Sequence, residues 1–170
     1  GDPKKESSIA GSLVSPTTDG ATNWPPPSFS PDTGLFYVGT TRGVSVFYLT
    51  DTDPRPQGWA AAERHVGNLG TELKAIDYKT GKIVWSRPLA MSVWGPGGGS
   101  MGLLSTAGKL LFGNDGGGNF VAYDAATGKP LWHAGLGNNT TNGPQTFLLD
   151  GRQYVVVGAR DQLFAFTLQQ

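Results

Sequence analysis

The chain has 170 residues, enough for one domain with a buried core. Its 13 Lys and Arg residues balance 13 Asp and Glu residues, so the formal net charge is zero and no basic excess favours a nucleic-acid partner. With 26 Gly, 12 Pro and no Cys, the composition predicts short strands joined by tight turns and excludes disulfides.

Residues 1–19 form a polar lead-in that is expected to be irregular, or to begin a chain cut from a longer one. This segment has no apolar h-region of the kind found in a signal peptide. No apolar run approaches the roughly 18–20 residues of a membrane span. Only residues 58–67, GWAAAERHVG, have a helix-like pattern, and it is very short. The sequence therefore predicts an all-β protein organised as a single domain over 1–170.

The first predicted unit occupies residues 20–89 and contains a long insertion at 43–71. Its strands are expected in NWPPPSFS (23–30), GLFYVGTT (34–41), LKAID (73–77) and KIVW (82–85). A second unit at 90–137 has four expected strands, SMGLLSTAG (100–108), KLLFGND (109–115), NFVAYD (119–124) and KPLWHAGL (129–136). The alternating apolar and polar side chains of 73–77 and 119–124 are typical of half-buried strands.

The third unit, residues 143–170, is incomplete. It has three expected strands, PQTFLLD (144–150), RQYVVVGAR (152–160) and DQLFAFTLQ (161–169), and no fourth. Three units cannot form a ring, because about four blades are the minimum for a closed propeller. The sequence therefore predicts either the C-terminal part of a larger propeller or an open fan that pairs with a second copy of itself to cover its edges.

The first two units share an eleven-residue repeat. AIDYKTGKIVW (75–85) and AYDAATGKPLW (122–132) have Ala, Asp, Thr, Gly, Lys and Trp at the same six offsets, and their starts are 47 residues apart. Each Asp is expected to accept hydrogen bonds from a turn, each Gly to adopt a positive φ, and each Trp to supply a large apolar surface. These structural residues are Asp77, Gly81, Trp85, Asp124, Gly128 and Trp132. A period of this length with several strands per unit favours a β-propeller.

The repeat resembles the tryptophan-docking motif of the pyrroloquinoline-quinone (PQQ) dependent dehydrogenases, eight-bladed quinoproteins that include methanol, ethanol and membrane glucose dehydrogenases. Three longer segments resemble the same family: GATNWPPPSFSPDTGLFYV (20–38), the stretch from SVWGPGGGS to the second repeat (92–132), and DGRQYVVVGARDQLFAFTL (150–168). The resemblance covers roughly residues 15–170 and about the last third of a family member. It implies that each Trp stacks on the glycine turn of the neighbouring blade.

The resemblance also implies cofactor contacts. Asn23 and Trp24 match an Asn–Trp pair that meets the quinone in the family, and Trp94 and Gly95 match a second position at the cofactor edge. PQQ carries carbonyls and three carboxylates, so an amide can donate to it while an indole lines its ring. In the structural alternative, Asn23 caps a turn and Trp24 packs in the core. The glycine-rich GPGGGSM (95–101) departs from the family pattern after Trp94.

For the whole protein, the resemblance implies a periplasmic oxidoreductase that oxidises a small alcohol or sugar with PQQ and Ca²⁺ and passes electrons to a cytochrome or a quinone. The family's catalytic Asp and calcium ligands lie in earlier blades, so this chain alone is expected to be inactive and to depend on the remaining blades. The alternative is a non-catalytic PQQ-like propeller, a scaffold for protein–protein interaction of the outer-membrane assembly type, which would have no reason to keep the Asn23–Trp24 segment.

Other patterns favour structural interpretations. The G-x-G-x-x-G at 97–102 precedes a strand instead of the helix that a nucleotide site requires. DTDPRPQG (51–58) lacks the later Glu of an EF-hand loop, and NNTT (138–141) is interpreted as a polar turn. His65 and His133 make a poor metal site without Cys, and His133 is expected to face solvent. No metal site is expected within the chain.

Overall fold

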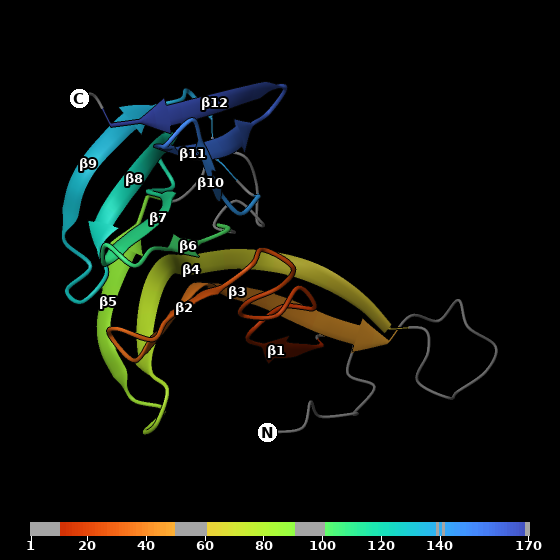
Figure 1. Ribbon diagram of the computed structural model, residues 1–170. Helices are drawn as coiled ribbons and strands as arrows, with labels where there is room; N and C mark the ends of the chain where they lie inside the picture. Colours follow the sequence, from red (N-terminus) through yellow and green to blue (C-terminus); the bar gives the residue numbers. More distant parts are fainter. Residues whose placement is uncertain (1–10, 50–60, 91–100, 139, 141, 169–170) are drawn as a thin grey trace.

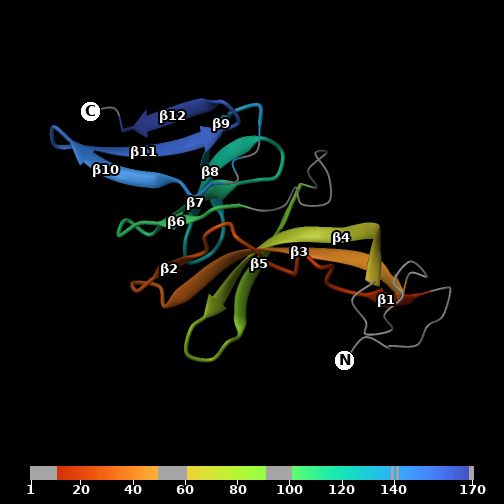
Figure 2. The same ribbon diagram turned by 90° about the vertical axis from the view of Figure 1, so that its right-hand side faces the viewer.

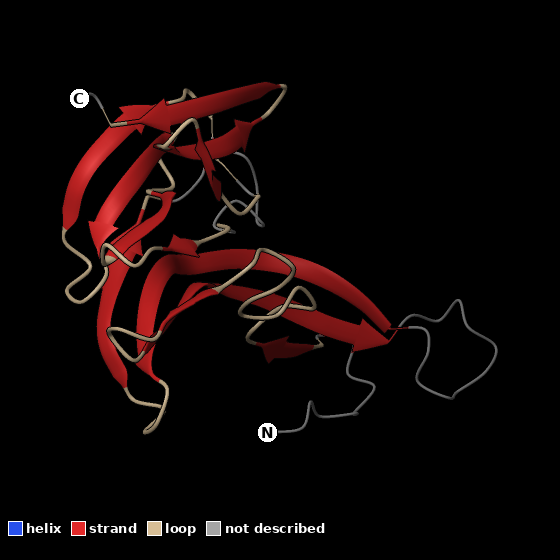
Figure 3. Ribbon diagram, viewed as in Figure 1, coloured by secondary structure: helices blue, strands red, loops and turns tan. Residues whose placement is uncertain are grey.

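Every regular element in the described part of the computed structural model is a β-strand, as Figures 1 and 3 show. The structure describes residues 11–49, 61–90, 101–138, 140 and 142–168. The strands are β1 (Ser12–Val14), β2 (Ser28–Ser30), β3 (Leu35–Leu49), β4 (Ala61–Asp77), β5 (Ile83–Leu89), β6 (Leu104–Ser105), β7 (Leu110–Asn114), β8 (Asn119–Asp124), β9 (Pro130–Gly135), β10 (Gln145–Leu149), β11 (Arg152–Ala159) and β12 (Gln162–Thr167). The all-β prediction is confirmed. In the described part of the chain, no helix has the length and apolar character needed to cross a bilayer.

The strands form three antiparallel sheets that are stacked as an open fan (Figure 1). The first sheet has the order β1-β3-β4-β5 with β2 also paired to β3, the second β6-β7-β8-β9, and the third β10-β11-β12. Neighbouring strands are mostly consecutive in the chain, because short turns can join only adjacent antiparallel strands. This is the radial strand order of propeller blades, and the predicted partial propeller is confirmed.

The middle sheet packs against another sheet on each of its faces. One face packs against the first sheet through a core formed by Leu35, Tyr37, Leu73, Ala75, Leu89, Met101, Leu103, Leu111, Val121, Tyr123 and Ala125. The other packs against the third sheet around Phe120, Leu136, Val157 and Ala159. Strand β8 supplies residues to both cores, and its four central residues are buried. The expectation of a half-buried strand at 119–124 is therefore wrong, because a sheet covers each of its faces.

The insertion expected at 43–71 lengthens two strands of the first sheet. β3 and β4 continue past the stacked sheets as a two-stranded arm, residues 41–49 and 61–71, which extends away from the fan in Figures 1 and 2. The helix-like pattern at 58–67 is overridden, because the described residues from 61 onward pair with β3. β1, within the segment expected to be irregular, pairs with β3 along the outer edge of the arm.

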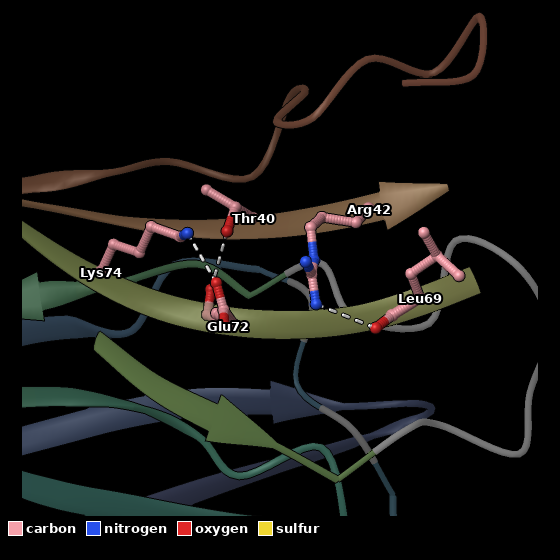
Figure 4. Close-up of polar contacts among 5 residues, drawn as sticks. All are labelled: Thr40, Arg42, Leu69, Glu72 and Lys74. Atoms are coloured by element: carbon pink, nitrogen blue, oxygen red, sulfur yellow. Dashed lines mark hydrogen bonds and ion pairs between the residues drawn. The ribbon is translucent and has the colours of Figure 1, made fainter. Parts of the chain in front are cut away.

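Polar contacts mark the base of the arm (Figure 4). The Thr40 hydroxyl donates to the Glu72 carbonyl at 3.3 Å, and the Arg42 guanidinium donates to the Leu69 carbonyl at 3.1 Å. Lys74 lies 2.5 Å from the Glu72 carboxylate and holds the pKa of that carboxyl below its ordinary value. The two hydrogen bonds link β3 to β4 beside the irregular register between Thr41 and Gly43, where ladder pairing is interrupted, whereas the ion pair lies within β4.

Candidate functional site

The two repeated turns have the same hydrogen bonds. In the second, the Asp124 carboxylate accepts from the hydroxyl and the backbone N–H of Thr127, both at 2.8 Å, and these bonds lower the pKa of Asp124. In the first, the backbone N–H and hydroxyl of Thr80 act in the same way on Asp77. The glycine that follows each Thr has a positive φ, 69° at Gly81 and 71° at Gly128, a conformation that glycine adopts without steric cost.

Trp85 of the first sheet packs directly on the Gly128 turn of the second. A Cβ placed on Gly128 would lie 2.7 Å from Cε3 of the indole, so only glycine allows the ring to lie this close. The indole Nε1–H donates to the Ala125 carbonyl at 3.2 Å, and the ring of Tyr37 lies 5.9 Å from that of Trp85. One indole thus joins two sheets by apolar contact and a hydrogen bond.

The other glycine and the other tryptophan of the repeat, Gly81 and Trp132, are less covered. None of the described residues lies within 4 Å of a Cβ placed on Gly81. Trp132 remains 42% exposed, although its ring contacts Phe166 of the third sheet at 5.2 Å between centroids. The chain therefore presents a bare glycine turn on one outer sheet and a half-exposed indole near the other.

The chain segments that lead into β2, β6 and β10, one strand from each sheet, meet at one point. We call this point the inner junction (Pro26, Gly102, Leu103 and Gly143). The Leu103 N–H donates to the Pro26 carbonyl at 2.9 Å. A Cβ on Gly102 would lie 2.3 Å from the Gly143 nitrogen, and a Cβ on Gly143 would lie 2.6 Å from Cγ of Pro26. The junction thus fixes the inner edges of the sheets by backbone contacts that tolerate only glycine.

Serine side chains extend the junction along the inner strands. The hydroxyls of Ser28 on β2 and Ser105 on β6 are 2.8 Å apart, the Ser105 N–H donates to the Ser28 hydroxyl at 2.9 Å, and the Ser105 hydroxyl donates to the Phe29 carbonyl at 2.8 Å. Because these bonds cross between sheets, the innermost strands of the first two sheets are held in a fixed relative position.

Asn23 and Trp24 lie on the loop between β1 and β2, immediately before the junction. The Asn23 amide donates to the Asp19 carbonyl at 3.1 Å, and its oxygen accepts from the Trp24 N–H at 2.8 Å. Asn23 therefore caps a turn, as the structural alternative expected. Trp24 is not part of a core in this chain, because 64% of it is exposed. The loop thus presents the exposed indole of Trp24 beside the amide of Asn23, whose orientation is fixed by two hydrogen bonds.

Trp94 and Gly95 lie outside the described residues, but the chain is anchored on both sides of them. The Ala90 N–H donates to the Asp115 carbonyl at 2.9 Å, and a Cβ on Gly116 would lie 2.1 Å from the Ala90 oxygen. On the other side, Gly102 belongs to the inner junction. The described residues on the two sides of Trp94, Ala90 and Gly102, are therefore both tightly packed.

A buried polar network supports the hairpin of β7 and β8, whose Asp115 carbonyl accepts from the Ala90 N–H. The Asn114 amide donates to the Thr140 carbonyl at 2.6 Å, and the Tyr123 hydroxyl donates to the Asn114 carbonyl at 3.1 Å. Burial raises the pKa of Tyr123 to about 12, so this hydroxyl stays protonated and remains a donor at neutral pH.

His133 is exposed, as expected. No group of three or more His, Asp and Glu side chains with metal-site geometry occurs within the described ranges.

This arrangement defines a class of protein: an open β-propeller whose blades are joined by a tryptophan of one blade on the glycine turn of the next. A family model described as PQQ glucose/ethanol/alcohol dehydrogenase, β-propeller domain, matches residues 70–155. The chain belongs to this family of PQQ-dependent dehydrogenases, as the sequence motifs indicated.

Individual relatives agree with the family assignment. The chain is 34% identical over 150 residues to the quinoprotein alcohol dehydrogenase PedE of Pseudomonas putida, a match that covers 85% of the chain and 23% of PedE. It is 35% identical over 150 residues to the quinoprotein ethanol dehydrogenase of Pseudomonas aeruginosa, with the same coverage. The quinohemoprotein alcohol dehydrogenase structure from Comamonas testosteroni superposes with a TM-score of 0.72 at 30% identity, over 88% of this chain and 24% of that one. The chain thus spans about a quarter of the length of these relatives.

Two parts of the site were not predicted from the sequence. The inner junction depends on contacts between residues far apart in the chain, and the richness in glycine and proline was attributed to tight turns alone. The attachment of the Asn23 loop to the arm was also missed, because nothing in the local sequence links Thr18 to Glu63 across 45 residues.

Proposed function

We propose that this chain is part of a PQQ-dependent dehydrogenase that oxidises a small alcohol, and that Asn23 and Trp24 form part of its quinone site. The observation that carries the proposal is the exposed Trp24 indole beside the held Asn23 amide, next to the inner junction. The exposed indole offers a flat apolar face, and a flat heterocycle is a suitable partner for it. The relatives' names favour an alcohol over a sugar as substrate.

The residues present fit the chemistry of the cofactor. The Asn23 amide nitrogen carries two hydrogens, and the bond to Asp19 uses one of them. The second could donate to a quinone carbonyl, and the exposed Trp24 indole could pack against the cofactor. The Trp24 N–H fixes the amide's orientation by donating to its oxygen. PQQ, when bound, supplies the redox chemistry by accepting two electrons from the substrate.

The remaining blades of a longer chain would cover the outer faces of the fan. On the third sheet, the face away from the second core exposes Phe147, Leu149 and Leu163. On the first, Ile83 and Val84 are more than half exposed. A blade before this chain would place its tryptophan on the Gly81 turn, and a second copy of the chain is the alternative cover. Under this proposal those blades also supply the Ca²⁺ ligands and the catalytic base, in a periplasmic enzyme that reduces a cytochrome or a quinone.

The test is a PQQ titration of the full-length apoprotein in the presence of Ca²⁺, with dye-linked ethanol oxidation and tryptophan quenching as readouts. Losing one hydrogen bond or one stacking contact is expected to weaken PQQ binding by roughly tenfold in both Asn23→Ala and Trp24→Ala. The matched control is Trp132→Ala, which removes an indole at the outer edge of the fan. It should leave PQQ affinity unchanged and lower stability by about 1–3 kcal/mol, less than for a fully buried Trp.

Unchanged PQQ affinity in both Asn23→Ala and Trp24→Ala would refute the site assignment. A full-length protein that binds no PQQ at all would refute the dehydrogenase proposal and favour a scaffold propeller.

A further inference from the structure

The loop that carries Asn23 and Trp24 is attached to the arm formed by β3 and β4 through residues 15–21. At its start, the Ser15 hydroxyl donates to the Gly43 carbonyl at 2.9 Å. In the middle of the loop, two residues before Asn23, the Ala21 carbonyl accepts from the Thr41 N–H at 2.8 Å. Figure 1 draws this loop, between β1 and β2, beside the arm. The arm thus serves as the surface on which the loop lies.

Close packing keeps the loop flat on that surface. A Cβ on Gly43 would lie 2.7 Å from Cγ2 of Thr17, so a side chain at this position would lift the loop away. Within the loop, the Gly20 N–H donates to the Thr17 carbonyl at 2.9 Å, which closes a turn. That turn contains Thr18 and Asp19.

Glu63 on β4 holds this turn with both carboxylate oxygens. Oε1 accepts from the Thr18 backbone N–H at 3.3 Å, and Oε2 accepts from the Thr18 hydroxyl. The next residue, Asp19, supplies the carbonyl that binds the Asn23 amide at 3.1 Å. A continuous path of bonds therefore runs from the Glu63 carboxylate, through Thr18 and Asp19, to the amide placed in the quinone site.

We propose that Glu63 is a positioning residue for the quinone site: it orients the Asn23 amide through Thr18 and Asp19. This inference rests on the proposed function, because it presupposes that Asn23 contacts PQQ. It assigns a role to the insertion at 43–71, which would otherwise be only a projection from the first blade. An ionised carboxylate that receives two bonds from one residue suits this role, because charge-assisted bonds hold geometry better than neutral ones.

A double-mutant cycle in the full-length protein tests the role of Glu63. PQQ affinity is measured in the Asn23→Ala, Glu63→Ala and doubly substituted apoproteins, together with the Tm of each. Glu63→Ala is expected to weaken PQQ binding by about threefold to tenfold, the size of one misplaced hydrogen bond. In the Asn23→Ala background it should cause no further loss, because a residue that acts through Asn23 has nothing left to orient.

Conservative substitutions and a neighbouring control sharpen the result. Glu63→Gln keeps an acceptor for Thr18 but not the charge, and should lose less affinity than Glu63→Ala. Thr18→Val removes the hydroxyl bond and keeps the backbone N–H bond, so it should cause part of the loss. The control Arg64→Ala removes a charge from the adjacent exposed position of the same strand, on its opposite face, and should leave affinity unchanged.

Two results would overturn the inference while leaving the proposed function intact. In one, Glu63→Ala lowers Tm but not PQQ affinity. In the other, it weakens PQQ binding equally with and without Asn23. If Asn23→Ala and Trp24→Ala themselves left affinity unchanged, the proposed function would fail first and the role of Glu63 with it.

Discussion

Gly102→Ala is expected to destabilise the protein strongly, and more than Gly143→Ala, the other glycine substitution at the inner junction. The new Cβ would lie 2.3 Å from the nitrogen and 2.4 Å from the Cα of Gly143. Both are backbone atoms, so the clash can be removed only if the third sheet moves away from the second. We expect this movement to stretch the hydrogen bond from the Leu103 N–H to the Pro26 carbonyl. We expect a loss of about 3 kcal/mol or more, at the upper end of the range for overpacking.

Gly108→Ala is the matched control, because a Cβ there meets its nearest neighbour, the Thr106 hydroxyl, at 3.7 Å. It should be neutral or stabilise slightly, since alanine restricts the unfolded chain. Equilibrium urea unfolding of both variants measures the difference. If Gly102→Ala were as stable as Gly108→Ala, the junction would not hold the three sheets together.

Gly128→Ala is expected to separate the first two sheets. Alanine at φ 71° costs about 1–2 kcal/mol from backbone strain alone. The new Cβ would also lie 2.7–3.0 Å from three atoms of the Trp85 ring, so the indole must shift and weaken its bond to Ala125. We expect a total loss of about 3–5 kcal/mol, comparable to the removal of a buried tryptophan.

Gly81→Ala separates the two contributions. Gly81 has φ 69°, which gives nearly the same backbone strain, but its Cβ position is open among the described residues. In the 170-residue chain, Gly81→Ala should therefore cost only the strain, and the difference between the variants measures the docking of Trp85. Equal losses in this chain would show that the indole contributes nothing at Gly128. In the full-length protein we expect the two losses to converge, because a preceding blade would cover Gly81.

Local sequence patterns were sufficient for much of the fold. The expected strands of the second and third units correspond to β6–β12, because Gly and Asp at fixed offsets specify turns and the apolar runs between them specify strands. The arm was harder to anticipate. The described residues of the helix-like pattern at 58–67, from Ala61 onward, pair with β3, and this pairing satisfies their backbone groups.

The candidate site shows a similar division. The Asn23–Trp24 pair was found only through the family resemblance, since an Asn before a proline-rich strand is also an ordinary turn cap. The loop's support could not be found at all, because Glu63 lies in a segment without a recognisable motif and meets Thr18 only after the arm has formed. Sequence patterns report local turns well, whereas contacts between blades depend on the three-dimensional arrangement.

The most direct test of the whole account is a crystal structure of the full-length protein with PQQ bound. We expect the Asn23 amide nitrogen to lie about 2.7–3.2 Å from a quinone oxygen. The Trp24 indole should lie in van der Waals contact with the quinone, and a tryptophan from a preceding blade should lie on Gly81. A quinone bound where it touches neither Asn23 nor Trp24 would contradict the account.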